Sequence, residues 1–532
     1  MKYIHIIALS AVAAVSLVGC NNENPALYTQ ENKSNDLRGV TVATYMESTS
    51  TRTTAEYETT KLAFYWTRGD KVWLHDIGET PEFVQNSGDN IDNQLNASGK
   101  DKVRNAGFYF PTPLNKASYP VRYTGYPTPA VDKVTIKAAQ NQAKPNKGEH
   151  IKTDGDCGVG SFTRGADGNY SFYLKHCASY LTFTPFFSKG FAPSVRLTQI
   201  KVSADQAIAG TYDIEDSGLD LDSRPLAEPS NRNITLTLNG GGNDGFTIPA
   251  VSTPETNAGI MVVAPGEYTN FTIEYTLYDQ ETKVRGTVIT KLGHVILKAG
   301  RNKRLSPDLD VRYYASDQYY MWDAQPGEHY WKGASKQPYL NGKYGDSYAK
   351  VGADPRWYNT VAHPGKASRL ATNNLNANEL MWLAYYGVPH WDSSMWTIMG
   401  HLYAGGMWLR NLDVIATTQK TTRERMKAVS PKGIDFTAYA QYDNFGAFVY
   451  TNTNIIPHRP RPTNGYFFLP TTGFYNNGRL YHISSRGYIW SSTPRAQSSS
   501  KVAQGYNFYI SRYEVHTGYG DRWNGIYQHV TR

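Results

Sequence analysis

Short runs rich in Val, Ile, Tyr and Thr recur along the chain between turn-forming Gly, Pro and Asn, and they restrict it to a mainly β fold. The run from Gly39 to Met46 alternates at a period of two, as a strand with one buried face does. We expect further strands at 62–66, 72–74, 172–174, 180–183, 199–202, 234–238, 259–263, 271–275 and 294–297. Many short strands at regular spacing predict β-sandwiches.

Two of these runs, 62–66 and 72–74, flank the tripeptide Arg68-Gly69-Asp70. Gly and Asp are turn formers, so we expect a hairpin-like pair of strands here.

After residue 311 the character of the chain changes to an α+β composition with long irregular connections. The segment 376–387 has a polar start, good helix formers and Gly387 as a stop, so it predicts a helix. A second short helix is expected at 421–429, and an aromatic strand at 506–510.

The first twenty residues carry a targeting signal. Lys2 precedes a short apolar stretch, Ile4 to Val18, which is typical of a secretory signal and too short for a permanent membrane helix. The sequence Leu17-Val18-Gly19-Cys20 resembles the bacterial lipobox, which implies cleavage before Cys20 and lipidation of that residue. The polar, aperiodic segment 21–38 is expected to be a tether.

Charge is distributed unevenly between the two halves. Residues 311–532 contain 23 Lys and Arg against 13 Asp and Glu, a net charge of +10, whereas residues 1–310 contain 31 against 33, a net charge of −2. The basic residues are dispersed without a basic run, and we expect no nucleic-acid partner. An acidic glycan or a protein surface fits the exported chain better.

Cys157 and Cys177 remain once Cys20 is assigned to lipid. They form a disulfide in one interpretation and remain free thiols in the other, because the sequence does not give the Cα separation that a bridge requires.

Residues 39–310 resemble the fimbrillin (Mfa-like) family, the lipoprotein pilins of type V pili, which have two transthyretin-like β-sandwich domains. The resemblance rests on Phe64-x-Trp66-x-x-Gly69-Asp70-x-Val72, Ala204-x-x-x-Ile208-Ala209-Gly210-Thr211 and Leu297-x-Ala299-Gly300.

Residues 311–532 are similar to the C-terminal, C-type-lectin-like modules of fimbrillin-like tip proteins (FISUMP-type). The matching segments are Trp322-Asp323-Ala324, Asn378-Glu379, Pro389-His390-Trp391-Asp392, Gly405-Gly406-x-Trp408, Phe468-Leu469-Pro470, Gly487-Tyr488-Ile489-Trp490-Ser491-Ser492 and Arg522-x-x-Gly525-x-x-x-x-Val530. The ending Gln528-His529-Val530-Thr531 departs from the more apolar, often Cys-containing tail of those modules.

Together these resemblances imply a signal peptide (1–20), a tether (21–38), β-sandwiches at 39–188 and 189–310, and an α+β lectin-like adhesin domain at 311–532. They also imply an outer-membrane lipoprotein that reaches the cell surface and joins a fimbrium as a tip or accessory subunit. In that family a protease cuts after an Arg that follows the first strand, and a strand from another pilus subunit then fills the exposed groove. Arg52 is the expected cleavage residue and Arg38 the second choice.

The expected ligand is a glycan or protein on a host or bacterial surface, with Tyr475, Tyr519 and Trp523 as candidate contacts. Asp521 and Asn524 faintly resemble a Ca²⁺ loop of lectin-like folds, but one acid and one amide do not support a Ca²⁺ site, and no other cofactor or metal is expected. No catalytic motif stands out, so we expect no enzyme. The alternative is a membrane-anchored lipoprotein that binds or processes glycans without polymerising.

Overall fold

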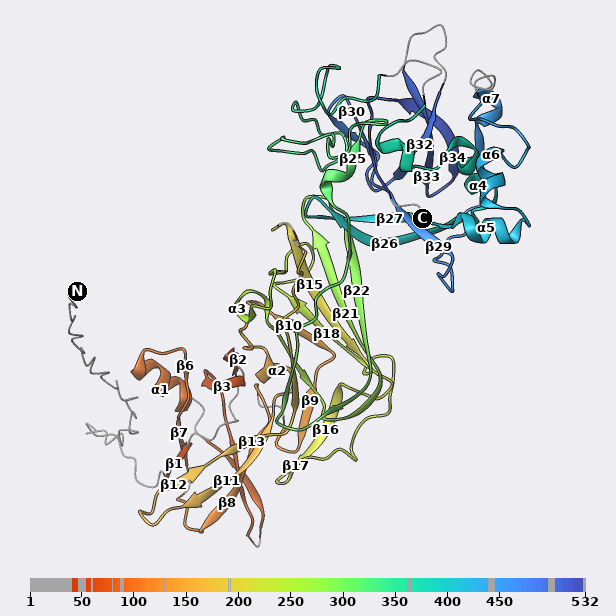
Figure 1. Cartoon of the computed structure of the whole chain (residues 1–532). Coiled ribbons are helices and arrows are strands. Elements are labelled where there is room, and N and C mark those ends of the chain that lie inside the picture. The colour runs from red at the N-terminus through yellow and green to blue at the C-terminus, as the bar shows by residue number, and fades with distance from the viewer. Residues whose placement is uncertain are drawn as a thin grey trace, which may run out of the picture.

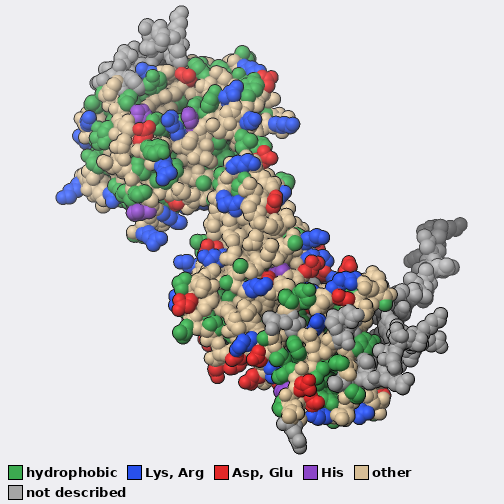
Figure 2. Space-filling model, turned by 180° about the vertical axis from the view of Figure 1, so that it is seen from behind, with side chains coloured by type: hydrophobic (Ala, Val, Ile, Leu, Met, Phe, Trp, Pro, Cys, Tyr) green, Lys and Arg blue, Asp and Glu red, His purple; other side chains and the backbone are tan. Residues whose placement is uncertain are grey.

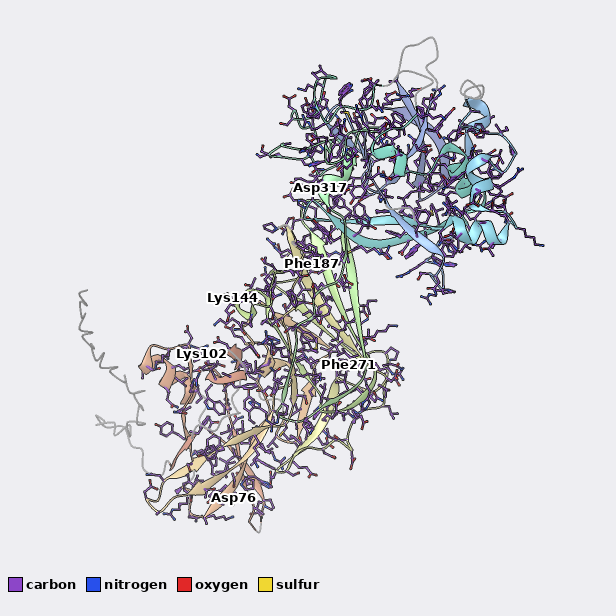
Figure 3. All side chains as sticks on the ribbon, viewed as in Figure 1. Asp76, Lys102, Lys144, Phe187, Phe271 and Asp317 are labelled. Carbon is purple, nitrogen blue, oxygen red and sulfur yellow. The ribbon has the colours of Figure 1, made fainter. Side chains whose placement is uncertain are left out.

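A computed structural model describes residues 41–45, 54–58, 61–78, 80–86, 90–111, 113–127, 130–189, 191, 193–360, 366–438, 445–495 and 503–529. The molecule is mainly β, as the sequence predicts, and its N-terminal, middle and C-terminal parts follow one another along an extended body (Figure 1). Figure 3 shows the side chains along this body, with Asp76 labelled near one end and Asp317 labelled where the C-terminal part begins.

An eight-stranded sheet in the order β5-β4-β8-β11-β12-β1-β7, with β13 on β11, organises the N-terminal part. A smaller sheet, β2-β3-β6, and one helix accompany it. Trp66, Phe108 and Phe172 are fully or almost fully buried in the core beneath them. The elements are β1 (Thr41–Tyr45), β2 (Thr54–Glu58), β3 (Lys61–Thr67), β4 (Trp73–Asp76), β5 (Glu82–Gln85), α1 (Asn90–Ser98), β6 (Lys102–Val103), β7 (Gly107–Phe110), β8 (Ser118–Tyr123), β11 (Gly158–Arg164), β12 (Tyr170–Phe172) and β13 (Leu174–His176).

Strand β1 confirms the strand predicted at 39–46, and it lies inside the sheet. It pairs in parallel with β12, with Ala43 opposite Tyr170, and antiparallel with β7, with Ala43 opposite Phe108. Because both neighbours pair with β1, its backbone links the edge strand β7 to the rest of the sheet.

The hairpin predicted for 62–66 and 72–74 is wrong. Both strands exist, but β3 pairs with β2 and β6, whereas β4 pairs with β5 and β8 in the other sheet. The turn at 68–70 is present: the Asp70 amide donates to the Thr67 carbonyl at 3.2 Å, and Gly69 has φ +79. This turn therefore carries the chain from one sheet to the other.

The middle part contains a six-stranded sheet, β10-β18-β15-β21-β22 with β19 on β15, and two smaller sheets, β20-β14-β23 and β17-β16-β9. Its elements are β9 (Lys133–Ile136), β10 (Ala139–Gln142), α2 (Ile151–Asp154), β14 (Ser179–Phe183), β15 (Val195–Ser203), β16 (Gly210–Glu215), β17 (Gly218–Leu219), β18 (Asn233–Leu238), β19 (Phe246–Thr247), α3 (Pro254–Asn257), β20 (Gly259–Val263), β21 (Gly266–Asp279), β22 (Arg285–Leu297) and β23 (Asn302–Leu305).

Strand pairing crosses position 188/189, where the sequence analysis places a domain boundary. Strand β10 pairs with β18, and β14 pairs with β20 and β23. Residues from before and after this position also share one large core, which includes Phe64, Tyr180 and Tyr275.

The C-terminal part consists of three four-stranded sheets, β24-β26-β27-β29, β25-β35-β30-β31 and β28-β34-β33-β32, with helices along one side (Figure 1). Its elements are β24 (Arg312–Tyr313), η1 (Ser316–Gln318), β25 (Tyr319–Tyr320), η2 (Leu370–Asn373), α4 (Ala377–Tyr386), β26 (His390–Ile398), β27 (His401–Arg410), α5 (Leu412–Thr418), α6 (Arg423–Ala428), α7 (Phe445–Phe448), β28 (Tyr450–Asn452), β29 (Tyr466–Pro470), β30 (Phe474–Asn476), β31 (Arg479–Tyr481), β32 (Arg486–Pro494), β33 (Gln504–Ser511), β34 (Val515–Asp521) and β35 (Gly525–Tyr527).

Helix α4 confirms the helix predicted at 376–387, and α6 confirms the one at 421–429. The Asn376 side chain accepts from the Glu379 amide at 3.0 Å, and the Glu379 carboxylate accepts from the Asn376 amide at 2.9 Å. This reciprocal capping box satisfies two amide groups that the first helical turn would otherwise leave unpaired.

The C-terminal and middle parts are joined by a buried polar contact. Asp279, at the end of β21, accepts from His401 Nδ1 and from the Leu402 amide, both at 3.0 Å. The Leu402 side chain belongs to the core of the middle part, and the Thr282 hydroxyl donates to the Leu402 carbonyl at 2.8 Å. The β26–β27 hairpin therefore docks on the middle part through apolar and polar contacts together.

Candidate ligand groove and strand slot

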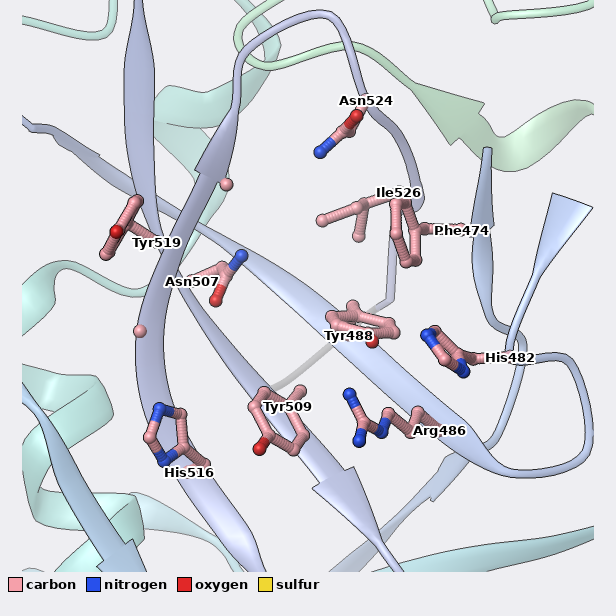
Figure 4. Close-up of a pocket in the computed structure, with 12 residues that line it drawn as sticks. Phe474, His482, Arg486, Tyr488, Asn507, Tyr509, His516, Tyr519, Asn524 and Ile526 are labelled. Carbon is pink, nitrogen blue, oxygen red and sulfur yellow. The ribbon is translucent and has the colours of Figure 1, made fainter. Parts of the chain in front are cut away.

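A groove of about 300 Å³ opens on the C-terminal part (Figure 4). Strands β32, β33 and β34 supply its floor, and residues around β30 and β35 supply one wall. This volume is at the lower end of the range for small-molecule sites, so it suits a compact ligand or the end of a larger one.

The register of the three floor strands decides which side chains face the groove. Tyr488 is opposite Tyr509, and Tyr509 is opposite His516. Two residues along, Asn507 is opposite Gly518, where no side chain stands. Since side chains alternate between the two faces of a strand, these residues share one face.

Two glycines make the floor hollow over β34. A Cβ at Gly520 would lie 3.0 Å from Asn507 Nδ2, 3.2 Å from the Trp490 ring and 3.5 Å from Asn524 Nδ2. A Cβ at Gly518 would lie 3.6 Å from Asn507 Oδ1. The groove therefore exists partly because these two positions carry no side chain.

Two asparagine amides lie at this end of the groove (Figure 4). Asn507 is 5% exposed and Asn524 is 7% exposed, so both are held by their surroundings. Within the part of the chain that the structure describes, Asn524 Oδ1 is buried without a hydrogen-bond partner. A buried amide oxygen left unpaired is costly, so a ligand hydroxyl or bound water at this end of the groove would stabilise it.

The other end of the groove is positively charged. The Arg486 guanidinium lies 5.1 Å from the centre of the Tyr509 ring, and none of the described lining residues is Asp or Glu. Burial lowers the pKa of His482 and of His516, and the Arg486 charge acts in the same direction on both, while Glu514 opposes the shift of His516. At neutral pH both imidazoles are therefore uncharged, and Arg486 supplies the groove's charge.

Aromatic rings line much of the groove. Tyr488 and Phe474 lie together in T-shaped contact, with ring centres 5.0 Å apart. The Tyr509 hydroxyl donates to Glu514 at 2.6 Å, and burial together with this bond raises its pKa. The tyrosine therefore stays protonated at neutral pH and presents its ring to the groove.

The three predicted ligand contacts have different positions. Tyr519 is 40% exposed and lines the groove. Trp523 is partly buried and packs near Tyr358, outside the groove lining. The prediction that Tyr475 is a surface aromatic is wrong: it is fully buried, and its hydroxyl bonds the Pro338 carbonyl.

The sequence did not single out Arg486 or Asn507, and it brought Asn524 forward only as a partner of Asp521 in a Ca²⁺ loop. The alternation Gly518-x-Gly520 within an aromatic strand was the one local sign of a hollow surface, because Gly inside a strand often marks a close approach or an open face.

Asp521 and Asn524, the pair considered for Ca²⁺, do not belong to a metal cluster. Across the described ranges, no group of three or more His, Cys, Asp or Glu side chains is arranged to hold a metal ion. In the same residues, no helix has the length and apolarity needed to cross a bilayer.

The position that β1 fills between β12 and β7, here called the β1 slot, is the second candidate site. Arg38, Arg52 and Cys20, which the sequence analysis assigns to processing and lipidation, lie outside the described residues.

Cys157 and Cys177 are buried and unbridged. The Cys177 amide donates to the Cys157 carbonyl at 2.8 Å, and the strand register places the two residues opposite each other. Burial raises the pKa of Cys157 well above its usual range. Residues opposite each other on antiparallel strands have Cα atoms about 4.5–5.5 Å apart, within the range that a disulfide spans, so the bridge and the free thiols both remain as interpretations.

Comparisons with known proteins give distant structural likenesses. No family model and no curated protein matches the sequence. A proposed cell adhesion protein from Bacteroides uniformis is 13% identical, with 51% of this chain and 93% of that chain covered and a TM-score of 0.28. A fimbrial protein from Bacteroides ovatus is 12% identical, with 92% and 99% covered and a TM-score of 0.22. Such low values assign neither a family nor an activity to this chain.

Proposed function

We propose that the chain is an exported adhesion subunit of a fimbrium, which joins other subunits by strand exchange at the β1 slot and contacts its ligand through the C-terminal groove. The observation that carries the proposal is the place of β1, the first described strand, inside the sheet rather than at its edge.

Loss of β1 would leave facing edges of β12 and β7 unpaired. Unpaired backbone N–H and C=O groups on two facing strands form a template for an added strand, whose main-chain bonds supply affinity. Phe108 and Phe110 on β7, at one border of the slot, are buried in the N-terminal core. An incoming strand would therefore gain both hydrogen bonds and apolar burial.

The position of Arg52 suits such an exchange. It falls in the segment between β1 and β2, so a cut there would separate β1 from the remaining chain, whereas a cut at Arg38 would leave β1 attached. Lipid at Cys20 would then anchor the subunit only until the cut.

We further propose that the C-terminal part binds rather than catalyses. A glycosidase pair needs two carboxyl groups flanking the scissile bond, and the described groove lining supplies none. Basic side chains are dispersed over the face of this part in Figure 2, without a continuous stripe of the kind that nucleic acid needs.

The test is to map the N-terminus of the protein recovered from the cell surface, for wild type, Arg52→Gln and Arg38→Gln. We expect wild type to begin at residue 53 and to enter polymers, Arg52→Gln to retain its original N-terminus and remain monomeric, and Arg38→Gln to behave as wild type. A wild-type surface protein that still begins at lipidated Cys20 would favour the alternative, a membrane-anchored glycan-binding lipoprotein that does not polymerise.

A further inference from the structure

We propose that the C-terminal groove binds a sugar that carries a carboxylate, with Arg486 as partner of the carboxylate and Asn507 and Asn524 as partners of the ring hydroxyls. This inference rests on the proposed function, because it takes the C-terminal part as the one that contacts the ligand.

The charge of the groove selects an anion. Among the lining residues that the structure describes, Arg486 is the one charged at neutral pH, and its guanidinium lies against the Tyr509 ring. Planar guanidinium groups bind carboxylates through two parallel hydrogen bonds, and such charge-assisted bonds are about twice as strong as neutral ones. Glu514, whose charge acts on Arg486 and His516, already accepts the Tyr509 hydroxyl at 2.6 Å.

The opposite end selects hydroxyl groups. Asn507 and Asn524 flank the space above Gly520, and each side-chain amide offers donors and an acceptor. Since rotation of an amide exchanges its oxygen and nitrogen, the unpaired Asn524 group can meet either a hydroxyl hydrogen or a hydroxyl oxygen. A simple carboxylate bound to Arg486 would leave the two asparagine side chains without a ligand partner.

The apolar walls between the two ends suit the faces of a sugar ring. Tyr488 and Tyr509 cross the floor side by side, and Phe474 and Ile526 lie along one wall (Figure 4). Sugar rings present C–H groups on their faces and hydroxyls at their edges, so an aromatic floor with polar ends matches both. The volume of about 300 Å³ admits a terminal sugar unit rather than a long chain.

Titration calorimetry on the protein as the cells export it would use a matched ligand pair, methyl glucuronide and methyl glucoside, which differ in a carboxylate against a hydroxymethyl group. We expect wild type to prefer the glucuronide by about tenfold, the size of one charge-assisted contact. Arg486→Gln should abolish that preference. Arg512→Gln, which removes the same charge from an exposed turn outside the groove, should leave it intact.

Gly520→Ala tests the hydroxyl end without changing charge. Its methyl group would occupy the space beside Asn507 and Asn524, and we expect both ligands to lose affinity together. Acetate at matched concentration controls for binding of any carboxylate. Equal binding of glucuronide and glucoside, unchanged selectivity in Arg486→Gln, or acetate binding as well as the glucuronide would each overturn the inference.

This experiment separates the inference from the assembly proposal. Binding of the glucuronide by a protein that is never cut at Arg52 would leave the inference standing and remove strand exchange. Normal polymers formed from a protein that binds neither sugar would leave strand exchange standing and remove the inference.

Discussion

The β1 slot and the C-terminal groove are suited to recognise partners by opposite means. The slot offers backbone groups of β12 and β7 above an apolar core, so most sequences able to form a strand with suitable apolar residues would fit it. The groove offers particular side chains, Arg486, Asn507 and Asn524, in fixed positions. One chain can therefore accept many strand sequences during assembly and still select its ligand closely, because the two sites lie in separate parts.

The largest expected effect comes from breaking the slot. Ala43→Pro removes an N–H from the strand that β12 and β7 both pair with, and we expect a loss of about 3 kcal/mol or more in the free energy of unfolding of the N-terminal part. Ala43→Val, which keeps the N–H and suits a strand, is the control. Urea unfolding and amide exchange of β7 and β12 measure the effect, and equal stability of the two variants would contradict it.

The next effect comes from the support beneath the groove. The buried carboxylate of Asp323 accepts from Asn359 Nδ2 at 2.6 Å and from the amides of Ser368, Arg369 and Ala371 at 2.8, 2.9 and 3.0 Å. Ala371 in turn shares a core cluster with Tyr488, which lines the groove, and with Trp490, whose ring lies close to Gly520.

Asp323→Ala removes the acceptor of four hydrogen bonds, two of which are buried, and we expect a loss of about 3 kcal/mol in the free energy of unfolding together with weaker ligand binding. Asp317→Ala, at an exposed position nearby, should change neither property. Denaturation and sugar titration on the same samples provide the measurement. A stable Asp323→Ala protein with intact binding would show that the groove does not depend on this loop.

A smaller effect concerns the joint between the middle and C-terminal parts. Burial alone would raise the pKa of Asp279, but the bonds from His401 and from the Leu402 and Glu281 amides outweigh it and lower the pKa from 3.8 to about 2. A folded pKa below the unfolded one means that the stabilisation is complete above about pH 4 and is lost as pH falls toward 2.

The lowered pKa of Asp279 corresponds to at most about 2 kcal/mol in the free energy of unfolding. Urea midpoints of wild type should therefore fall between pH 4 and pH 2 more steeply than those of Asp279→Asn. Parallel pH profiles for the two proteins would contradict a role for this carboxylate in the joint.

The sequence predicted the elements whose formation depends on residues close together in the chain. The α4 helix was predictable because Asn376, Glu379 and Gly387 mark its ends within a dozen residues. The β3–β4 hairpin was mispredicted because strand pairing depends on distant partners: β4 pairs with β8, some fifty residues away. The groove could not be predicted for the same reason. It combines β32, β33 and β34 with residues around β30 and β35, and no single segment determines how these strands align.

Two tyrosines predicted as equivalent give the smallest and sharpest test. Tyr519 lines the groove at 40% exposure, so Tyr519→Ala should weaken sugar binding about fivefold, as loss of about 1 kcal/mol of ring contact does, with little change in stability. Tyr475 is fully buried and bonds the Pro338 carbonyl, so Tyr475→Phe should cost about 1 kcal/mol of stability and leave sugar affinity unchanged. If both variants changed the same property, ligand contact and core packing would not be separable in this part, and the contrast between a tolerant slot and a strict groove would lose its physical basis.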